Sequence, residues 1–159
     1  MIKNFREQTH LGYIAILRIL IGFFFLMSGI SKYSSGFLQK PILKGVLQKW
    51  AEGNPNIWYK SFLLDTAIPN YEIFAYLVVY GEILVGFCLL LGLLTRISSA
   101  FGIFMNINFL LGNGWSGPAN KNVNILFIAL QIIFIASAAG RSIGDDGILK
   151  KRFSKIPIF

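Results

Sequence analysis

Four apolar runs separated by polar or glycine-containing turns divide the chain. They cover residues 11–30, 73–94, 97–111 and 123–139. About 20 apolar residues in a helix span the ~30 Å hydrocarbon core of a bilayer, so the first two runs are long enough to cross it. The pattern predicts an all-α integral membrane protein, a four-transmembrane-helix bundle whose third and fourth spans are the shortest. We expect residues 1–159 to form a single membrane domain that ends in a basic tail, residues 141–159.

The longest connection, residues 32–70, mixes apolar and basic side chains. Its first half repeats apolar positions at helical spacing, with Lys and Gln opposite, which predicts a short amphipathic helix between the first two spans. Three uses of this segment are open. It can attach to the membrane interface, with Trp50, Trp58 and Tyr59 at headgroup level, cap the bundle, or dock a partner.

The composition agrees with a membrane location. Hydrophobic residues make up 55% of the chain and charged residues 14%, whereas soluble domains carry about 25% charged residues. The net charge of +8 is dispersed over connections and tails, where basic side chains meet lipid headgroups. We therefore expect the lipid bilayer as a partner and no nucleic acid.

The few cysteine and histidine residues limit the chemistry. Cys88 is the single cysteine and His10 the single histidine, so an internal disulfide and bis-histidine haem ligation are excluded. No Cys/His cluster offers a zinc or iron–sulfur site. We expect no metal and no covalent cofactor.

Basic residues indicate the orientation. With the N-terminus inside, eight Lys and Arg residues lie on the inner side and six on the outer side, which favours cytoplasmic termini. The first apolar run lacks a small-residue cleavage site and contains Arg18, so we expect a retained helix rather than a signal peptide.

Each run also carries a stripe of small and polar residues. We expect Arg18, Glu82, Asn106 and Gln131 to form a buried polar seam, one from each span. Glycines on the same faces let neighbouring backbones approach closely. The helix-packing glycines expected are Gly22, Gly29, Gly86 and Gly102.

Arg18 and Glu82 place opposite charges inside adjacent spans. A charge at that depth costs several kcal/mol unless it is paired or wetted. At 1.5 Å per residue, the distances of Arg18 and Glu82 from the inner ends of their spans differ by ~8 Å. Two long side chains can bridge this difference, so an ion pair is expected. Two alternatives are open: Glu82 is a protonatable group beside a quinol, with Arg18 setting its pKa, or Arg18 snorkels beside a neutral Glu82.

Several segments resemble a known family. LRILIGFFFLMSGISK in the first span, GEILVGFCLLLGLLTR in the second and GRSIGDDG after the fourth resemble the DoxX family of small four-helix membrane proteins. The stretch from NPNIWYKSFL through PNYEIFAYLVVYGEILVG is closer to its DoxD branch. The resemblance covers residues 13–149. The family's patterned positions are Arg18, Gly29, Lys32, Glu82, Gly86, Gly92, Arg96 and Arg141.

The resemblance implies a small subunit of a thiosulfate:quinone oxidoreductase in a prokaryotic cytoplasmic membrane. The chain has neither paired cysteines nor a cofactor motif, so any enzymatic role is that of a subunit rather than of a stand-alone enzyme, and catalytic residues are not identified. Quinone is then the expected ligand of the polar seam.

Two functional hypotheses follow. In the first, the chain is a quinone-linked subunit of a membrane redox complex with partner subunits. In the second, it is a non-catalytic structural subunit of a larger respiratory or photosynthetic complex. Transport is disfavoured, because the sequence shows no inverted repeat of the kind that alternating access uses.

Overall fold

The computed structural model describes residues 2–141 and 143–152, with side chains from residue 12 onward, and this part of the chain is helical without strands. The elements, in order, are α1 (Ile2–Ser34), α2 (Ile42–Glu52), α3 (Ile57–Phe62), the π-helix η1 (Leu63–Ala67), α4 (Tyr71–Leu91), α5 (Thr95–Asn113), η2 (Gly114–Ser116), α6 (Pro118–Ser137), η3 (Ala139–Arg141) and α7 (Asp145–Arg152).

Three helices of the described residues are long and apolar enough to cross a membrane. They are residues Gly12–Ser34 of α1, α4 and α6. The predicted third span corresponds to α5, which is slightly shorter than α4 and α6 and carries more polar residues. The four long helices extend beyond the predicted runs at every boundary except two. α4 ends at Leu91 rather than residue 94, because Gly92 is left-handed (φ 67°), and α6 ends at Ser137 rather than residue 139, before left-handed Ala138.

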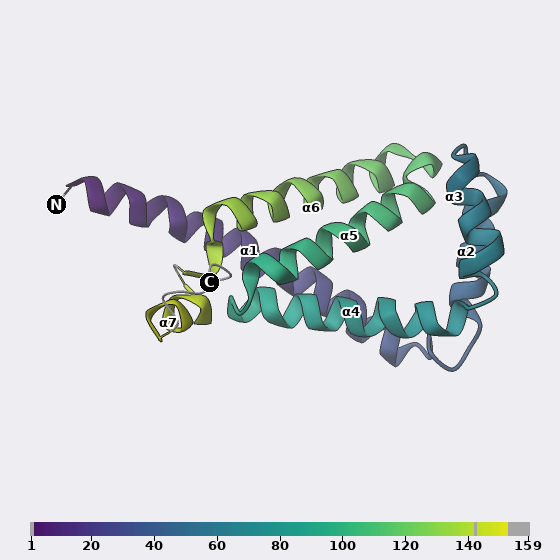
Figure 1. Ribbon diagram of the computed structural model, residues 1–159, viewed down its shortest axis with the longest axis horizontal. Coiled ribbons are helices and arrows are strands. Elements are labelled where there is room, and N and C mark those ends of the chain that lie inside the picture. The colour runs from purple at the N-terminus through teal and green to yellow at the C-terminus, as the bar shows by residue number, and fades with distance from the viewer. Residues whose placement is uncertain (1, 142, 153–159) are drawn as a thin grey trace.

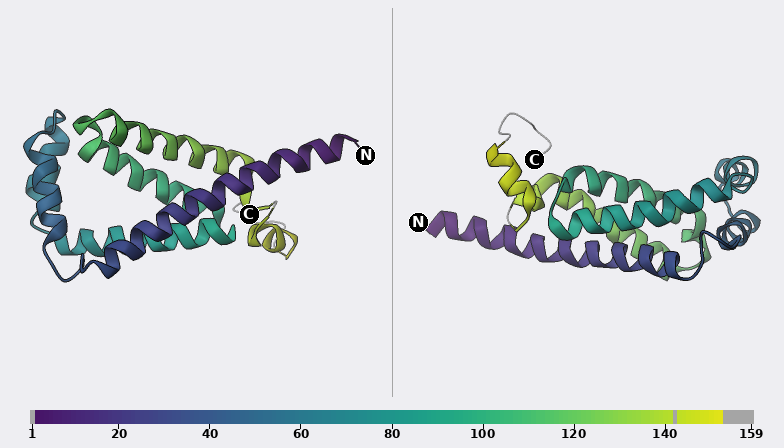
Figure 2. Two further views of the ribbon diagram at one scale, coloured as in Figure 1. Left: turned by 180° about the vertical axis from the view of Figure 1, so that it is seen from behind. Right: turned by 90° about the horizontal axis from the view of Figure 1, so that it is seen from below.

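The long helices form two antiparallel pairs that diverge from one end. α1 packs along α4 and α5 packs along α6, as Figures 1 and 2 show. α4 and α5 separate from their shared turn, and α2 and α3 lie across the open side (Figure 1). The N-terminus and α7 lie at the other end. We call these the α2–α3 end and the α7 end.

Glycines set the distance between α1 and α4. A Cβ at Gly86 would lie 2.4 Å from the backbone nitrogen of Leu26, and one at Gly22 would lie 2.7 Å from that of Leu90. Backbone cannot move aside as a side chain can, so these positions exclude larger residues. Gly29 lies against Ile83 and Val79 in the same way. The close crossing fixes the position of α1 on α4.

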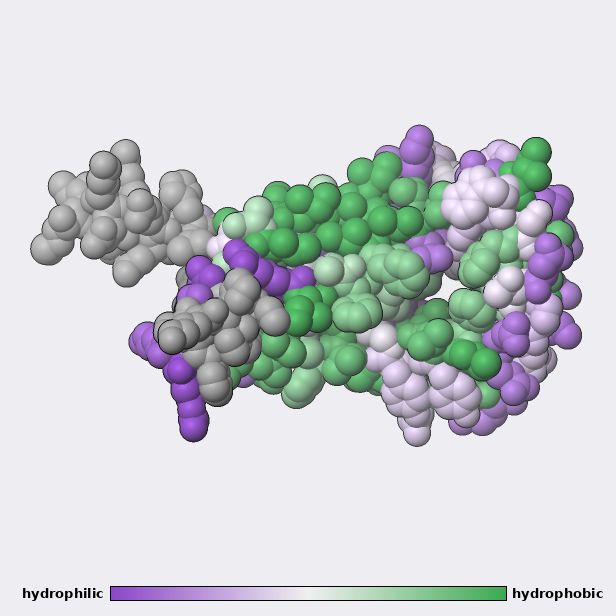
Figure 3. All heavy atoms as spheres, in the orientation of Figure 1, coloured by the Kyte–Doolittle hydropathy of each residue, from purple (hydrophilic) through white to green (hydrophobic). Residues whose placement is uncertain are grey.

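The amphipathic segment caps the bundle. Leu43, Leu47 and Ala51 of α2 are buried and pack with Ala75 and Val79 of α4. Of the three uses open from the sequence, the structure shows the packing expected of a cap: the apolar face of α2 contacts the protein's own helices. The outward side of this end is hydrophilic, whereas green apolar surface covers the long helices (Figure 3).

Candidate functional site

An ion pair between α1 and α4 lies at the centre of the candidate site. Lys32 Nζ donates to both carboxylate oxygens of Glu82, at 2.6 and 2.8 Å, and to Ser28 Oγ at 2.7 Å. Glu82 is 3% exposed, and the side chain of Lys32 is 28% exposed. Because Lys32 lies near the end of α1, its long side chain reaches back along the helix to meet a carboxylate deep in α4.

The expected contact between Arg18 and Glu82 is absent. Arg18 lies about 21 Å from Lys32 along α1, at 1.5 Å per residue, and therefore at the α7 end. There its Nη1 donates to the carbonyl oxygen of Ala139 at 3.0 Å, and its Nη2 donates to that of Ile143. Arg18 and Glu82 thus have different partners, because each side chain binds groups that lie closer to it along the helix axes.

Arg18 belongs to a buried network that closes the α7 end. Asp146 of α7 accepts hydrogen bonds from the backbone nitrogens of Leu94 (2.7 Å) and Thr95 (2.9 Å), at the start of α5. A carboxylate at a helix N-terminus satisfies free N–H groups and complements the helix dipole. A Cβ at Gly92 would lie 2.1 Å from Arg18 Nη1, so glycine is required there for space as well as for its positive φ. The network joins the middle of α1 to the segment after α6, and α7 to the turn between α4 and α5.

A large cavity occupies the space between the diverging helices. Its volume is about 1240 Å³, and Lys32, Glu82 and Asn106 line it together with aromatic and aliphatic side chains from α1 to α6. Figure 3 shows the hollow between α4, α5 and the α2–α3 end. Phe101 and Phe104 line the cavity and are 62% and 65% exposed. The cavity therefore opens sideways, through the apolar surface of the long helices.

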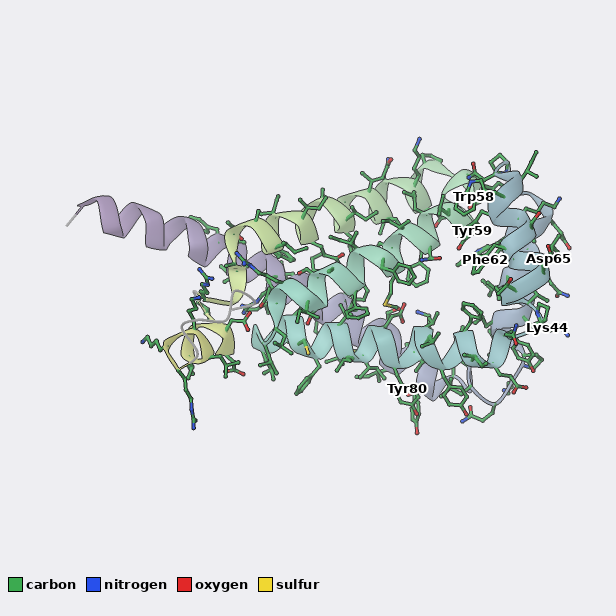
Figure 4. The ribbon with its side chains drawn as sticks, in the orientation of Figure 1. Lys44, Trp58, Tyr59, Phe62, Asp65 and Tyr80 are labelled. Carbon is green, nitrogen blue, oxygen red and sulfur yellow. The ribbon has the colours of Figure 1, made fainter. Side chains whose placement is uncertain are left out.

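α3 closes the cavity at the α2–α3 end. Tyr59 and Phe62 point from α3 toward the long helices, whereas Lys44 and Asp65 point away (Figure 4). The hydroxyl of Tyr59 donates to the backbone oxygen of Asn108 at 3.0 Å and lies 3.3 Å from its side-chain oxygen. Asn108 thus contacts another helix, while Asn106 is buried and donates to the backbone oxygen of Gly102.

The chain matches a known protein family over most of its length. Residues 13–158 match the model of one family, described as the TQO small subunit DoxD. The chain belongs to the DoxD family. Neither the curated proteins nor the solved structures include a significant match. Membership and the three apolar helices together make this DoxD protein an integral membrane protein.

Two residues that contribute to the DoxD site are not among the predicted seam residues. Lys32 is predicted only as a patterned and basic position, yet Arg18, Gly22, Gly29 and Lys32 follow one another at spacings of four, seven and three residues. That spacing places Lys32 on the same face of α1 and could have identified it. Asp146 lies within the GRSIGDDG segment that carries the family resemblance, but its position in a short polar segment after the last span does not indicate its partner.

Gln131 lies apart from the ion pair. It is fully buried on α6, and its amide faces Gly102 of α5. The four seam residues therefore occupy three places: Arg18 at the α7 end, Gln131 between α5 and α6, and Glu82 and Asn106 on the cavity wall. The cavity wall is the part where polar groups meet open volume.

Replacing Tyr59 with phenylalanine tests the closure by α3. Burial raises the pKa of Tyr59 to about 12 from 10.0, so ionisation of the unfolded state above pH 10 weakens folding of the wild type. We expect Tyr59→Phe to cost about 1 kcal/mol near pH 8, through loss of the hydrogen bond to Asn108. The difference should fall to zero at about pH 11 and reverse towards pH 12, because each pH unit between the two pKa values removes about 1.4 kcal/mol from the wild type. Thermal unfolding from pH 8 to 12 measures it, and a difference independent of pH would contradict the assignment.

Proposed function

We propose that this DoxD protein is the membrane subunit of a quinone-linked redox complex and that its cavity binds the quinone headgroup beside Lys32 and Glu82. One observation carries the proposal: a buried carboxylate, paired with a partly buried ammonium, faces a large apolar cavity that opens through the lipid-facing surface. Ligand sites are commonly apolar cavities with a few convergent polar groups. A sideways opening suits a molecule that is dissolved in the bilayer. The family description gives the redox context.

The polar groups on the cavity wall match both redox forms of a quinone. The Glu82 carboxylate can accept a hydrogen bond from a quinol hydroxyl. Ser28 accepts from Lys32 and keeps its own O–H as a donor, and the Asn106 amide uses one N–H on Gly102 and keeps the other. These donors suit a quinone carbonyl. A quinone supplies two-electron chemistry by taking up two electrons, here from the partner subunit, and two protons.

Glu82 is positioned to exchange those protons. Lys32 fixes the carboxylate at both oxygens and balances its charge, and the pair faces the same cavity as the proposed ligand. A carboxylate held within hydrogen-bond reach of a substrate hydroxyl is the arrangement that general acid–base chemistry requires. Lys32 is in this scheme the positioning residue.

The membrane arrangement proposed here places four helices across the bilayer. α5 lies along α6 and beside α4, so the three apolar helices carry it through the same layer. Its polar residues face inward: Thr95, Ser99 and Asn106 are buried. An even number of crossings puts both termini on one side, which we propose is the cytoplasm.

Binding of a short-tail quinone tests the proposal. We expect the full chain in lipid nanodiscs to bind decylubiquinone and its quinol saturably. Glu82→Gln should weaken quinol binding about tenfold or more and quinone binding less, because a hydrogen bond to a charged group contributes about 1.5–3 kcal/mol. Quenching of tryptophan fluorescence can report binding, since Trp50 lines the cavity.

The matched control is Glu52→Gln, which removes an exposed carboxylate at the end of α2. It should leave the affinity for both redox forms unchanged. Absence of saturable binding to the wild type would overturn the proposal. Equal affinities for Glu82→Gln and wild type would remove Glu82 from the site.

A structural role in a larger complex is the second candidate. α6 is the most exposed of the apolar helices, with 11% of its span buried, so most of its surface is available to lipid or to a partner subunit. Purification from native membranes in mild detergent, followed by mass spectrometry, separates the two roles. A redox partner together with bound quinone favours the first, and a multisubunit complex without quinone at this chain favours the second.

A further inference from the structure

Polar atoms without partners lie on α5 and on the facing side of α6. Thr95 Oγ1, Ser99 Oγ and both amide atoms of Gln131 are buried and make no hydrogen bond within the described part of the chain. All three residues are 0% exposed. Leaving such an atom unsatisfied costs about 1–3 kcal/mol, and buried polar atoms are otherwise paired with protein or with ordered water. Four such atoms along one side of α5 point to the same kind of partner, ordered water.

These atoms form a row along one face of α5. Thr95, Ser99, Gly102 and Asn106 follow one another at intervals of three or four residues, or about 4.5–6 Å of helix rise. The amide of Gln131 lies at the level of Gly102, where a Cβ would be 2.5 Å from its Nε2. Two hydrogen bonds of about 2.8 Å through one water span such an interval.

The row joins the α7 end to the cavity. At the α7 end, Thr95 Oγ1 and Asp146 Oδ2 would each lie 2.2 Å from a Cβ at Gly140, so they are at most twice that distance apart. At its other end, Asn106 lines the cavity together with Glu82. The distance from Thr95 to Asn106 is about 16 Å along the helix, roughly half the hydrocarbon thickness.

We propose that the row defined by Thr95, Ser99, Gln131 and Asn106 holds buried water and conducts protons between the α7 end and Glu82. This inference rests on the proposed function for its purpose, since reduction of one quinone takes up two protons with its two electrons. The hydroxyl and amide groups hold the water in line, and Glu82 is the terminal group that exchanges the proton with the ligand.

Cysteine reactivity tests whether the row is wet. In a Cys88→Ala background, Ser99→Cys places a thiol in the row, and a small cationic methanethiosulfonate reagent labels thiolates that water reaches. The matched control is Val79→Cys, which is equally buried at 0% exposure but lies in the apolar core of α4 and outside the row. We expect Ser99→Cys in nanodiscs to react at least tenfold faster than Val79→Cys.

Slow labelling of Ser99→Cys would overturn the proposal. If Ser99→Cys reacts no faster than Val79→Cys while both proteins keep the helical content of the wild type, the row is dry and the proposal is overturned. Should Ser99→Cys fail to fold, Thr95→Cys provides the same comparison one turn away. The reaction needs no quinone, so a dry row and a cavity that binds no quinone are separate results.

Discussion

Replacing Glu82 with glutamine should destabilise the protein by about 3 kcal/mol. The substitution leaves the Lys32 ammonium partly buried beside an apolar cavity, with only Ser28 as a partner. Breaking a buried ion pair from one side costs about 3–5 kcal/mol, and the partial exposure of Lys32 places the value at the lower end of that range. Unfolding in mixed micelles of increasing dodecyl sulfate fraction, followed by circular dichroism, measures the change.

A double variant separates the charge from the shape. Lys32→Met with Glu82→Gln removes both charges together and should recover most of the lost stability, since replacing a whole buried pair is often close to neutral. Glu52→Gln, at an exposed position, should stay within about 0.5 kcal/mol of the wild type. A single Glu82→Gln variant as stable as the wild type would show that Lys32 is hydrated rather than held by the carboxylate.

Replacing Arg18 with methionine should cost a similar amount at the opposite end. The substitution deprives the carbonyl oxygens of Ala139 and Ile143 of their donor and removes the positive charge beside Asp146. Leaving the buried carbonyl of Ala139 without a partner costs about 1–3 kcal/mol, and the partly buried carbonyl of Ile143 adds less, so we expect a loss of about 3 kcal/mol. The same titration applies, and protease cleavage within α7 should accelerate, because Arg18 holds that end against the bundle.

Arg18→Lys is the informative comparison. A single ammonium can satisfy one of the two carbonyls more readily than both, because lysine lacks the planar fork of arginine, so about half of the stability should return. Lys49→Met, on the exposed face of α2, should have little effect. If Arg18→Met leaves α7 as resistant to protease as the wild type, the contacts between Asp146 and the start of α5 suffice to hold it.

The sequence predicts the long helices well, because apolar run length is a direct consequence of membrane thickness. It predicts the buried face of α1 from spacing alone, and the cap by α2 as one of three uses. The partner of Glu82 could not be predicted by comparing the positions of residues along their helices. That comparison treats side chains as lying level with their Cα atoms, whereas Lys32 extends back along α1 to reach its carboxylate.

The α7 end shows a second limit. Glycine and aspartate in a short polar segment indicate a turn, and the pairing of Asp146 with the first amides of α5 depends on a tertiary contact between residues about fifty apart. The cavity is likewise a property of divergence between α4 and α5. Hydrophobic periodicity identifies which faces are apolar but does not state how far apart the faces lie.

The two acceptors of Arg18 have a consequence for biosynthesis. They follow it by 121 and 125 residues, and a ribosome adds about 5–20 residues per second. For roughly 6–25 s the nascent first helix therefore carries a guanidinium whose final partners do not yet exist. Until then, the first helix must stay near the membrane surface or against other proteins. Its final insertion depends on the last segment to be synthesised. A nascent chain that stops before Ala139 retains that charge without either carbonyl, which gives membrane quality control a chemical mark of incompleteness.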